Sequence, residues 1–233
     1  MPESGAEQMA EPGLEALVAN RTLSPEMAAT LAVAASERRS LLVFAVPRLA
    51  GKTTVMLAAL GHAPEGTPIH ELSAGSGTGL GIPDPPDGGY LVMHEIAQAP
   101  MPHYLWGGPV RRVFEALRGG GLSLAVTLHA GGFEEAFSII LEQNEVPAAD
   151  ASLIDYAVHI RTLGPDWRAP TRRVVAELHE VTGVSDGHVG ASLLHRWDEA
   201  TDRFETVGEP SLLAHHSELL ARRAGDFRRG QEQ

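Results

Sequence analysis

The chain has no cysteine and only one lysine in 233 residues. Without cysteine it has neither a disulfide framework nor a thiolate metal site. Aromatic residues make up 5% of the chain, so we expect a core built mainly of leucine, valine, alanine and isoleucine. No apolar run approaches the roughly 20 residues that a membrane-spanning helix needs, and the acidic first residues lack the layout of a signal peptide. These absences favour a cytoplasmic protein.

Positive charge is also scarce, since the chain has 18 basic and 30 acidic residues and a formal net charge of −12. This excess disfavours a general nucleic-acid binder and a protein that binds anionic membranes directly. We therefore expect no nucleic-acid partner, and peripheral membrane contact only through partner proteins. Eleven histidines are present, but no H-E-x-x-H motif, and the adjacent pair His215-His216 is predicted on a helix surface, so no zinc site is expected.

The single lysine, Lys52, lies where a phosphate-binding loop needs one. A buried apolar run at 40–46 precedes it and a helical pattern at 55–60 follows, in the order strand, turn, Gly-Lys-Thr, helix. A chance Gly-Lys-Thr at a helix start is the alternative, and the flanking strand and the lone lysine argue against it. The motif G-x-x-x-x-G-K-[ST] is met except at its first glycine, where Val46 stands. The predicted phosphate-binding residues are Pro47, Arg48, Leu49, Ala50, Gly51, Lys52, Thr53 and Thr54, and the Thr53 hydroxyl is the predicted Mg²⁺ ligand.

Two further polar residues end buried strands downstream of this loop. Glu95 ends the run that starts at Tyr90, where a carboxylate can polarise water or hold Mg²⁺ through water. The alternative is an ordinary surface carboxylate at a strand end. His129 follows the strand 122–128, where it could contact a γ-phosphate, although position alone favours a strand-end histidine with a structural role.

The remaining patterns predict a parallel α/β core followed by a β-rich extension in one domain. Ser24 is the predicted N-cap of a helix that begins at Pro25 and runs to about Arg38. Disorder is expected at 1–12 and 226–233, and a single domain at 13–225, with a core at about 38–145, an extension at 155–207 and a C-terminal helix at 211–224. Other expected helices cover 14–19, 110–117 and 133–141; expected strands cover 69–72, 156–163, 173–181 and 192–197, and 73–89 is a long loop.

Together these pieces resemble the secretion ATPase superfamily, the motors of type II and type IV secretion and of type IV and tight-adherence pili. The likeness covers residues 20–205 and is greatest to the conjugation and tight-adherence branch. Its most specific string is Thr127-Leu128-His129-Ala130 followed by Glu134-Glu135-Ala136-Phe137. The resemblance implies a RecA-like P-loop NTPase fold, ATP and Mg²⁺ as cofactors, and a homo-oligomeric ring, possibly a hexamer, or a subunit of a secretion or pilus assembly. It also implies catalytic roles for Glu95, for His129 at the γ-phosphate, and for Glu71 in the acidic box.

The chain departs from the pattern of this family at several charged positions. Its Walker B strand ends His94-Glu95-Ile96-Ala97, without the usual arginine, and its acidic box at 69–72 offers one carboxylate, Glu71. The N-terminal domain that often supplies arginines in this family is expected to be absent or on another chain. Each loss removes charge stabilisation from phosphoryl transfer. We therefore expect slow Mg²⁺-dependent ATP hydrolysis or, alternatively, a non-hydrolysing nucleotide-binding regulatory or partner subunit. A small-molecule kinase is disfavoured because 73–89 contains no arginine for a lid.

Overall fold

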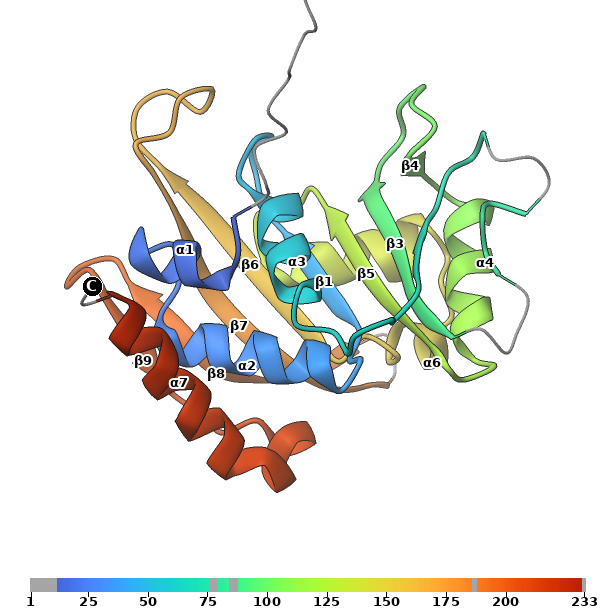
Figure 1. Cartoon of the computed structure of the whole chain (residues 1–233). Helices are drawn as coiled ribbons and strands as arrows, with labels where there is room; N and C mark the ends of the chain where they lie inside the picture. The colour runs from blue at the N-terminus through green and yellow to red at the C-terminus, as the bar shows by residue number, and fades with distance from the viewer. Residues whose placement is uncertain (1–11, 76–78, 84–87, 186–187, 232–233) are drawn as a thin grey trace, which may run out of the picture.

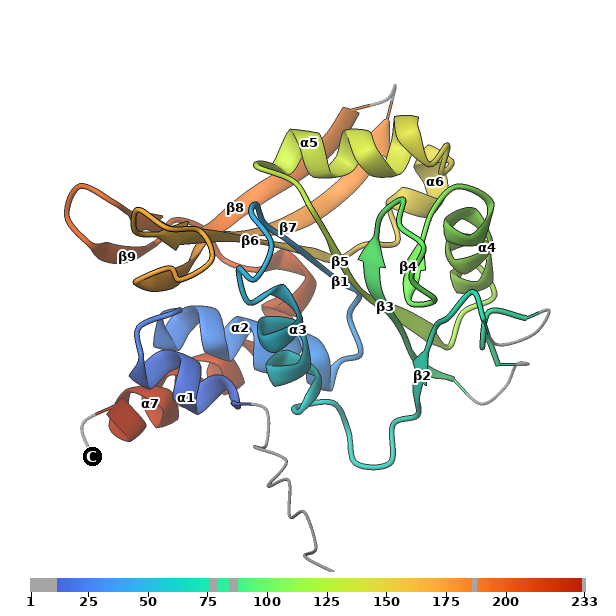
Figure 2. The ribbon, with the colours of Figure 1, turned by 90° about the horizontal axis from the view of Figure 1, so that it is seen from above.

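The computed structural model describes residues 12–75, 79–83, 88–185 and 188–231, so the expected disorder of residues 1–11 and part of the 73–89 loop lie outside it. A single nine-stranded sheet runs through the molecule in the order β2-β3-β5-β1-β6-β7-β8-β9, and β4 pairs with β3 beside this path. Helices cover both faces of the sheet, as Figures 1 and 2 show. The expected α/β fold with a mostly parallel core is confirmed.

The parallel part of the sheet holds the segments that the sequence places around the predicted phosphate-binding loop. The central strand β1 (Leu41–Phe44) lies between β5 and β6 and is parallel to both. The strand that carries Glu95, β3, is separated from β1 by β5. The other parallel strands are β2 (Ile69–Glu71), β3 (Gly89–Ile96), β4 (Tyr104–Leu105), β5 (Leu122–Leu128) and β6 (Tyr156–Leu163). Burial on both faces explains the almost continuous apolar sequences of β1, β3 and β5.

The predicted β-rich extension continues this sheet rather than forming a second one. Beyond β6 the strands are antiparallel: β7 (Arg172–Ser185), β8 (His188–Asp198) and β9 (Arg203–Thr206). The strands β7 and β8 are longer than expected, and the four-residue β9 was not expected at all. This strand is too short to show a clear alternation of apolar and polar residues, which explains why the sequence does not predict it.

Two apolar cores lie on the two faces of the sheet. One core packs α1 (Leu14–Ala19), α2 (Pro25–Ser36) and α3 (Lys52–Leu60) against one face. On the other face lie α4 (Gly108–Leu117), α5 (Phe133–Ser138), the π-helix η1 (Ile139–Gln143) and α6 (Ala148–Ala151). Ser24 caps α2 as predicted, because its Oγ accepts a hydrogen bond from the Met27 amide at 3.1 Å.

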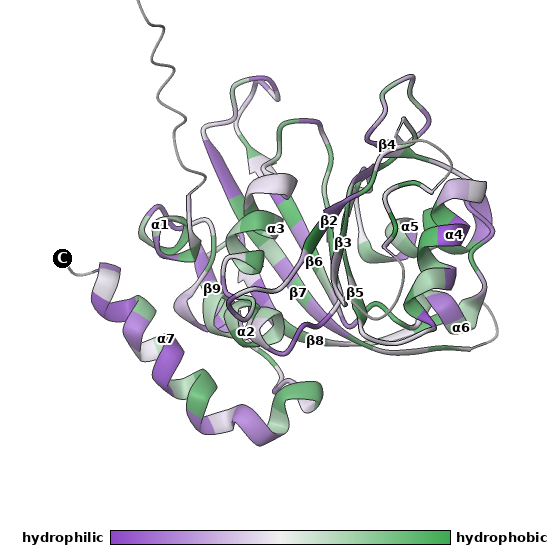
Figure 3. Ribbon diagram, turned by 45° about the vertical axis from the view of Figure 1, so that its right-hand side comes forward, coloured by the Kyte–Doolittle hydropathy of each residue, from purple (hydrophilic) through white to green (hydrophobic). Residues whose placement is uncertain are grey.

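The C-terminal segment differs from the expectation of one helix and a disordered tail. A 3₁₀ turn, η2 (Ser211–His216), leads into α7 (Ser217–Gln231), which continues six residues past the expected boundary at 225. Its apolar positions alternate with charged ones (Figure 3). Phe227 is buried, Arg228 pairs with Glu26, and the Gln231 side-chain amide donates to the Val18 carbonyl at 2.7 Å. Contacts with α1 and α2, which local sequence does not reveal, therefore order residues 226–231. In the described ranges no helix has both the length and the apolar character to cross a bilayer.

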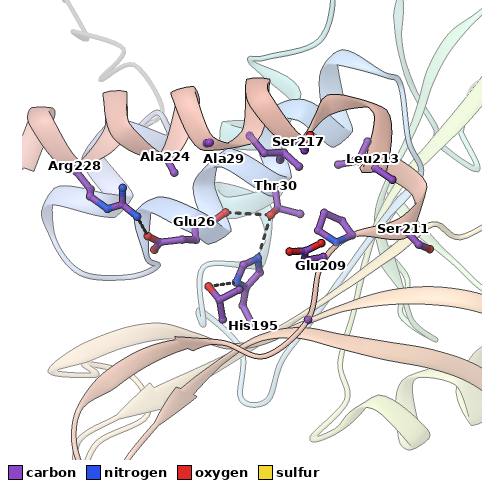
Figure 4. A pocket seen from close by; sticks show the side chains of 16 residues that line it. Glu26, Ala29, Thr30, His195, Glu209, Ser211, Leu213, Ser217, Ala224 and Arg228 are labelled. Atoms are coloured by element: carbon purple, nitrogen blue, oxygen red, sulfur yellow. Dashed lines mark hydrogen bonds and ion pairs between the residues drawn. The ribbon is translucent and has the colours of Figure 1, made fainter.

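A cavity of about 720 Å³ remains between α7, α2 and β8, and His195 lies in its wall (Figure 4). The Thr30 hydroxyl donates to the Glu26 carbonyl at 3.1 Å and therefore accepts from His195 Nε2, also at 3.1 Å. His195 Nδ1 then accepts from the Thr206 hydroxyl at 3.2 Å. Burial lowers the pKa of His195 to about 4, so the ring is neutral at pH 7.

This histidine should make the fold sensitive to mild acid. In the unfolded chain His195 binds a proton below about pH 6.5, its ordinary pKa. In the folded chain it binds a proton only below about pH 4, its lowered pKa. Stability is therefore expected to fall as the pH drops through this window, by about 3 kcal/mol in total. Urea unfolding of wild type and His195→Gln between pH 7 and 4 measures the difference. The slope of the unfolding free energy against pH reports the protons taken up on unfolding, and in His195→Gln this uptake should be smaller by close to one proton. His188→Gln, at an exposed position, should follow wild type. Equal slopes for wild type and His195→Gln would contradict this assignment.

Candidate functional site

The predicted phosphate-binding loop connects the end of β1 to the first residue of α3. Gly51 is the N-cap of α3 and adopts a left-handed backbone with φ +90°. A Cβ at this position would lie 3.2 Å from Cδ of Arg173, so conformation and packing both favour glycine. The other left-handed residue of the loop is Leu49, and Val46 is not left-handed. This loop therefore does not require glycine at its first motif position, which explains why valine is tolerated there.

Three polar side chains from separate elements meet at the end of this loop. Lys52 Nζ lies 3.3 Å from Glu95 Oε2 and 3.2 Å from His129 Nδ1. His129 Nε2 lies 3.6 Å from the same Glu95 oxygen. Lys52 comes from the start of α3, Glu95 from the end of β3, and His129 follows β5, the strand between β1 and β3. The sheet order therefore brings together the three residues that the sequence analysis selected separately.

The contacts within this group define its protonation. An ammonium group can only donate, so His129 Nδ1 accepts from Lys52 and the ring hydrogen lies on Nε2, facing Glu95. Burial lowers the pKa of His129, which favours the neutral ring. Burial also lowers the pKa of Lys52, while the Glu95 carboxylate opposes that effect. The result is a buried ion pair with a neutral histidine beside it.

One oxygen of Glu95 has no partner among the residues that the structure describes. Its Oε2 contacts Lys52 and lies 3.4 Å from the Thr127 hydroxyl, whereas its buried Oε1 makes no hydrogen bond within the described part of the chain. A buried carboxylate oxygen without a partner is costly, and it is available to a metal ion or a hydrogen-bond donor. The Thr53 hydroxyl belongs to the same cavity. Carboxylate and hydroxyl oxygens are the ligands that Mg²⁺ takes, so these residues fit a magnesium ion.

The group opens into a cavity of about 880 Å³ whose wall is rich in positive charge. Arg48, Lys52, Arg172 and Arg173 line it, and Glu95 is the carboxylate among the lining residues. The guanidinium of Arg172 is engaged by Asp202, at 2.6 Å. In a chain of net charge −12, this local excess of cations favours an anionic ligand at the start of α3, where the helix dipole adds to the attraction.

Arg173 is a site residue that the sequence analysis did not select. Its Nε donates to the Leu49 carbonyl at 2.9 Å, and its side chain covers Gly51. The contact fixes the loop and adds a cation to the cavity wall. The only sequence signal is the pair Arg172-Arg173 at the start of the strand expected at 173–181. Because 122 residues separate Arg173 from Gly51, no local pattern links them.

Glu71, in contrast, is not brought to this group. It lies on β2, at the edge of the sheet beyond β3, and does not line the cavity around Lys52. Its carboxylate is 3.7 Å from His94 Nε2, and 60% of its side chain is exposed. The ring of His94 in turn packs edge-on against His103 at 5.6 Å between centroids. The structure therefore separates Glu71 from Glu95 and His129.

One solved structure found to be similar is the VirB11 ATPase of the Brucella suis type IV secretion system in complex with sulphate. The two chains share 19% identity with a TM-score of 0.44, and the match covers 64% of this chain and 50% of that chain. The aligned region thus spans half the length of the VirB11 chain. No protein-family model matches the sequence, and no curated protein matches it.

Proposed function

We propose that this protein is an ATP-binding P-loop ATPase of the secretion or pilus motor type, with slow Mg²⁺-dependent hydrolysis. The observation that carries the proposal is the convergence of Lys52, Glu95 and His129 at the start of α3, inside a cavity lined by cations. A buried lysine, a carboxylate with a free oxygen and a helix N-terminus are the parts that binding and cleaving a triphosphate require.

Lys52 has two alternative partners in this proposal. Without nucleotide its ammonium group is neutralised by Glu95. In the complex it turns from the carboxylate to the β- and γ-phosphate oxygens, and the amides of the loop from Ala50 to Thr54 bind the same phosphates. This exchange releases Glu95 to orient the attacking water, while His129, through its Nε2–H, contacts the γ-phosphate.

The Thr53 hydroxyl and, through water, the free Glu95 oxygen are the groups that would hold Mg²⁺. When bound, the ion neutralises charge on the phosphates. The contribution of Arg173 is to hold the loop through the Leu49 carbonyl, so that the amides already point into the cavity.

Slow turnover follows from the charges that the site lacks. Ala97 stands where related strands carry arginine, and Glu71 does not line the cavity. The same observations favour the second candidate, a non-hydrolysing nucleotide-binding regulatory or partner subunit. In either case a neighbouring subunit of a ring, possibly a hexamer, or a partner in a secretion or pilus assembly would supply the missing cations. We place such an assembly in the cytoplasm.

Calorimetry with ATP, with and without Mg²⁺, tests the proposal directly. We expect one nucleotide per chain and tighter binding with Mg²⁺, together with phosphate release above that of a chain lacking the lysine. Binding without phosphate release would select the non-hydrolysing subunit. No heat of binding under either condition would refute both. Light scattering with and without a non-hydrolysable ATP analogue measures whether nucleotide promotes ring assembly.

A further inference from the structure

Three side chains with metal-ligating groups meet where η2 crosses the C-terminal end of α2. Glu37 is the C-cap of α2, and His215 and His216 are the last two residues of η2. His216 Nε2 lies 2.8 Å from Glu37 Oε1, and His215 Nε2 lies 3.8 Å from Glu37 Oε2. One ligand atom from each residue falls within 4.8 Å of the other two. The sequence shows only the adjacent histidines, because Glu37 is 178 residues away.

These distances suit a common metal ion. Two ligands on one tetrahedral Zn²⁺ ion lie about 3.3 Å apart, given metal–ligand bonds of about 2.0–2.1 Å. The distances from the two histidine nitrogens to the two Glu37 oxygens, 3.8 and 2.8 Å, lie on either side of that value. The Glu37 and His215 side chains are exposed, and small rotations of them would make the two nitrogen–oxygen distances equal. Two imidazoles and one carboxylate form a donor set that binds divalent transition metals in preference to Mg²⁺ or Ca²⁺.

The protein leaves one of these ligand atoms unsatisfied. His216 Nε2 is buried and makes no hydrogen bond within the described residues, since its close approach to Glu37 lacks hydrogen-bond geometry. Glu37 is also placed unfavourably, because a carboxylate at a helix C-terminus faces the negative end of the dipole. A cation between the three side chains would satisfy the nitrogen and relieve this repulsion.

Space for further ligands is present in front of the histidines. A cavity of about 510 Å³ is lined by residues 215–219 and Arg222, and Glu218 contributes a second carboxylate to its wall. Water molecules could complete the coordination there, as at zinc sites with three protein ligands.

We propose that Glu37, His215 and His216 bind one divalent transition-metal ion of the Zn²⁺ type, which fastens the C-terminal segment to α2. The ion would close a contact between residues far apart in the chain, and its binding energy would add to the stability of the docked α7. The proposal does not depend on nucleotide binding, because none of these three residues lines the Lys52 cavity.

The test is calorimetric titration of the metal-free full chain with Zn²⁺, without nucleotide or Mg²⁺. We expect one ion per chain, and binding at least about 10-fold weaker in Glu37→Gln, His215→Ala and His216→Ala. His188→Ala, which removes an exposed histidine elsewhere, is the matched control and should bind as wild type does. Hydrogen exchange supplies a second readout, since Zn²⁺ should slow exchange in residues 217–231 of wild type and of the control alone.

Several results would overturn the proposal. One is no Zn²⁺ binding by wild type, and another is equal affinity in wild type and the three ligand variants. Weak binding of several ions, reduced as much by His188→Ala as by His216→Ala, would show only adventitious surface contacts. An ion lost in His129→Ala but kept in Glu37→Gln would belong to the Lys52 cavity. Circular dichroism shows whether each variant is folded, and His215→Ala, at an exposed position, keeps the test valid if His216→Ala unfolds.

Discussion

Replacing Lys52 with alanine is expected to weaken ATP binding by at least about 100-fold, because two or more charge-assisted hydrogen bonds to phosphate are lost at once. The remaining Glu95 carboxylate, which lies 3.3 Å from the ammonium group in wild type, would then face the triphosphate without a counter-charge. Calorimetry with Mg²⁺-ATP measures the loss. Arg48→Ala removes an exposed cation from the same cavity wall and should cost far less.

The Lys52→Ala variant should also lose stability, since removing one partner of a buried ion pair typically costs about 3–5 kcal/mol. A second variant separates this effect from nucleotide binding. Lys52→Ala combined with Glu95→Gln removes both charges, so it should recover much of the stability in urea unfolding but only a small part of the ATP affinity. If the double variant binds ATP within a few-fold of wild type, Lys52 is not a phosphate ligand and the proposed function fails.

Glu95→Gln is expected to have opposite effects on ATP hydrolysis and on ATP affinity. Hydrolysis should fall by about 10²- to 10⁴-fold, because an amide cannot accept the proton of the attacking water. ATP binding should become tighter, because Lys52 no longer has to leave a carboxylate and the cavity loses its negative charge. Single-turnover phosphate release and calorimetry measure these two quantities separately.

Glu145→Gln, an exposed carboxylate that pairs with Arg111, provides the matched control and should leave both quantities at wild-type values. Weaker binding of ATP by Glu95→Gln would contradict the exchange of partners proposed for Lys52. Unchanged hydrolysis would show that another group activates the water. If wild type itself releases no phosphate, the affinity change still tests the ion pair, and the subunit interpretation follows.

The sequence selected the three residues that meet at the candidate site because its signals are local. Gly51-Lys52-Thr53 and its flanking strand and helix lie within about 20 residues, and such a segment reveals its own conformation. Glu95 and His129 could be selected because each follows an apolar run that reads as a buried strand. Their meeting with Lys52 required only that parallel strands end at one edge of the sheet, which this fold class provides.

Other features depended on packing between distant segments. The sequence grouped Glu71 with the catalytic residues through its resemblance to a family, but the sheet order places β2 at an edge and Glu71 away from Lys52. The tail after residue 225 looked disordered because its polar residues have no local partner. Its helix is held by Glu26 and Val18, which precede it by about 200 residues.

The amino-acid sequence by itself determined a Gly-Lys-Thr loop between a strand and a helix of an α/β core, because the spacing of apolar residues and this one string specify strand, turn and helix locally. Only the tertiary structure decided that Arg173 covers Gly51, that Glu95 keeps a free buried oxygen, and that Glu37 joins His215 and His216. Each of these features depends on residues more than 30 positions apart in the chain. The packing of the whole sheet and its helices decides which of these distant side chains meet.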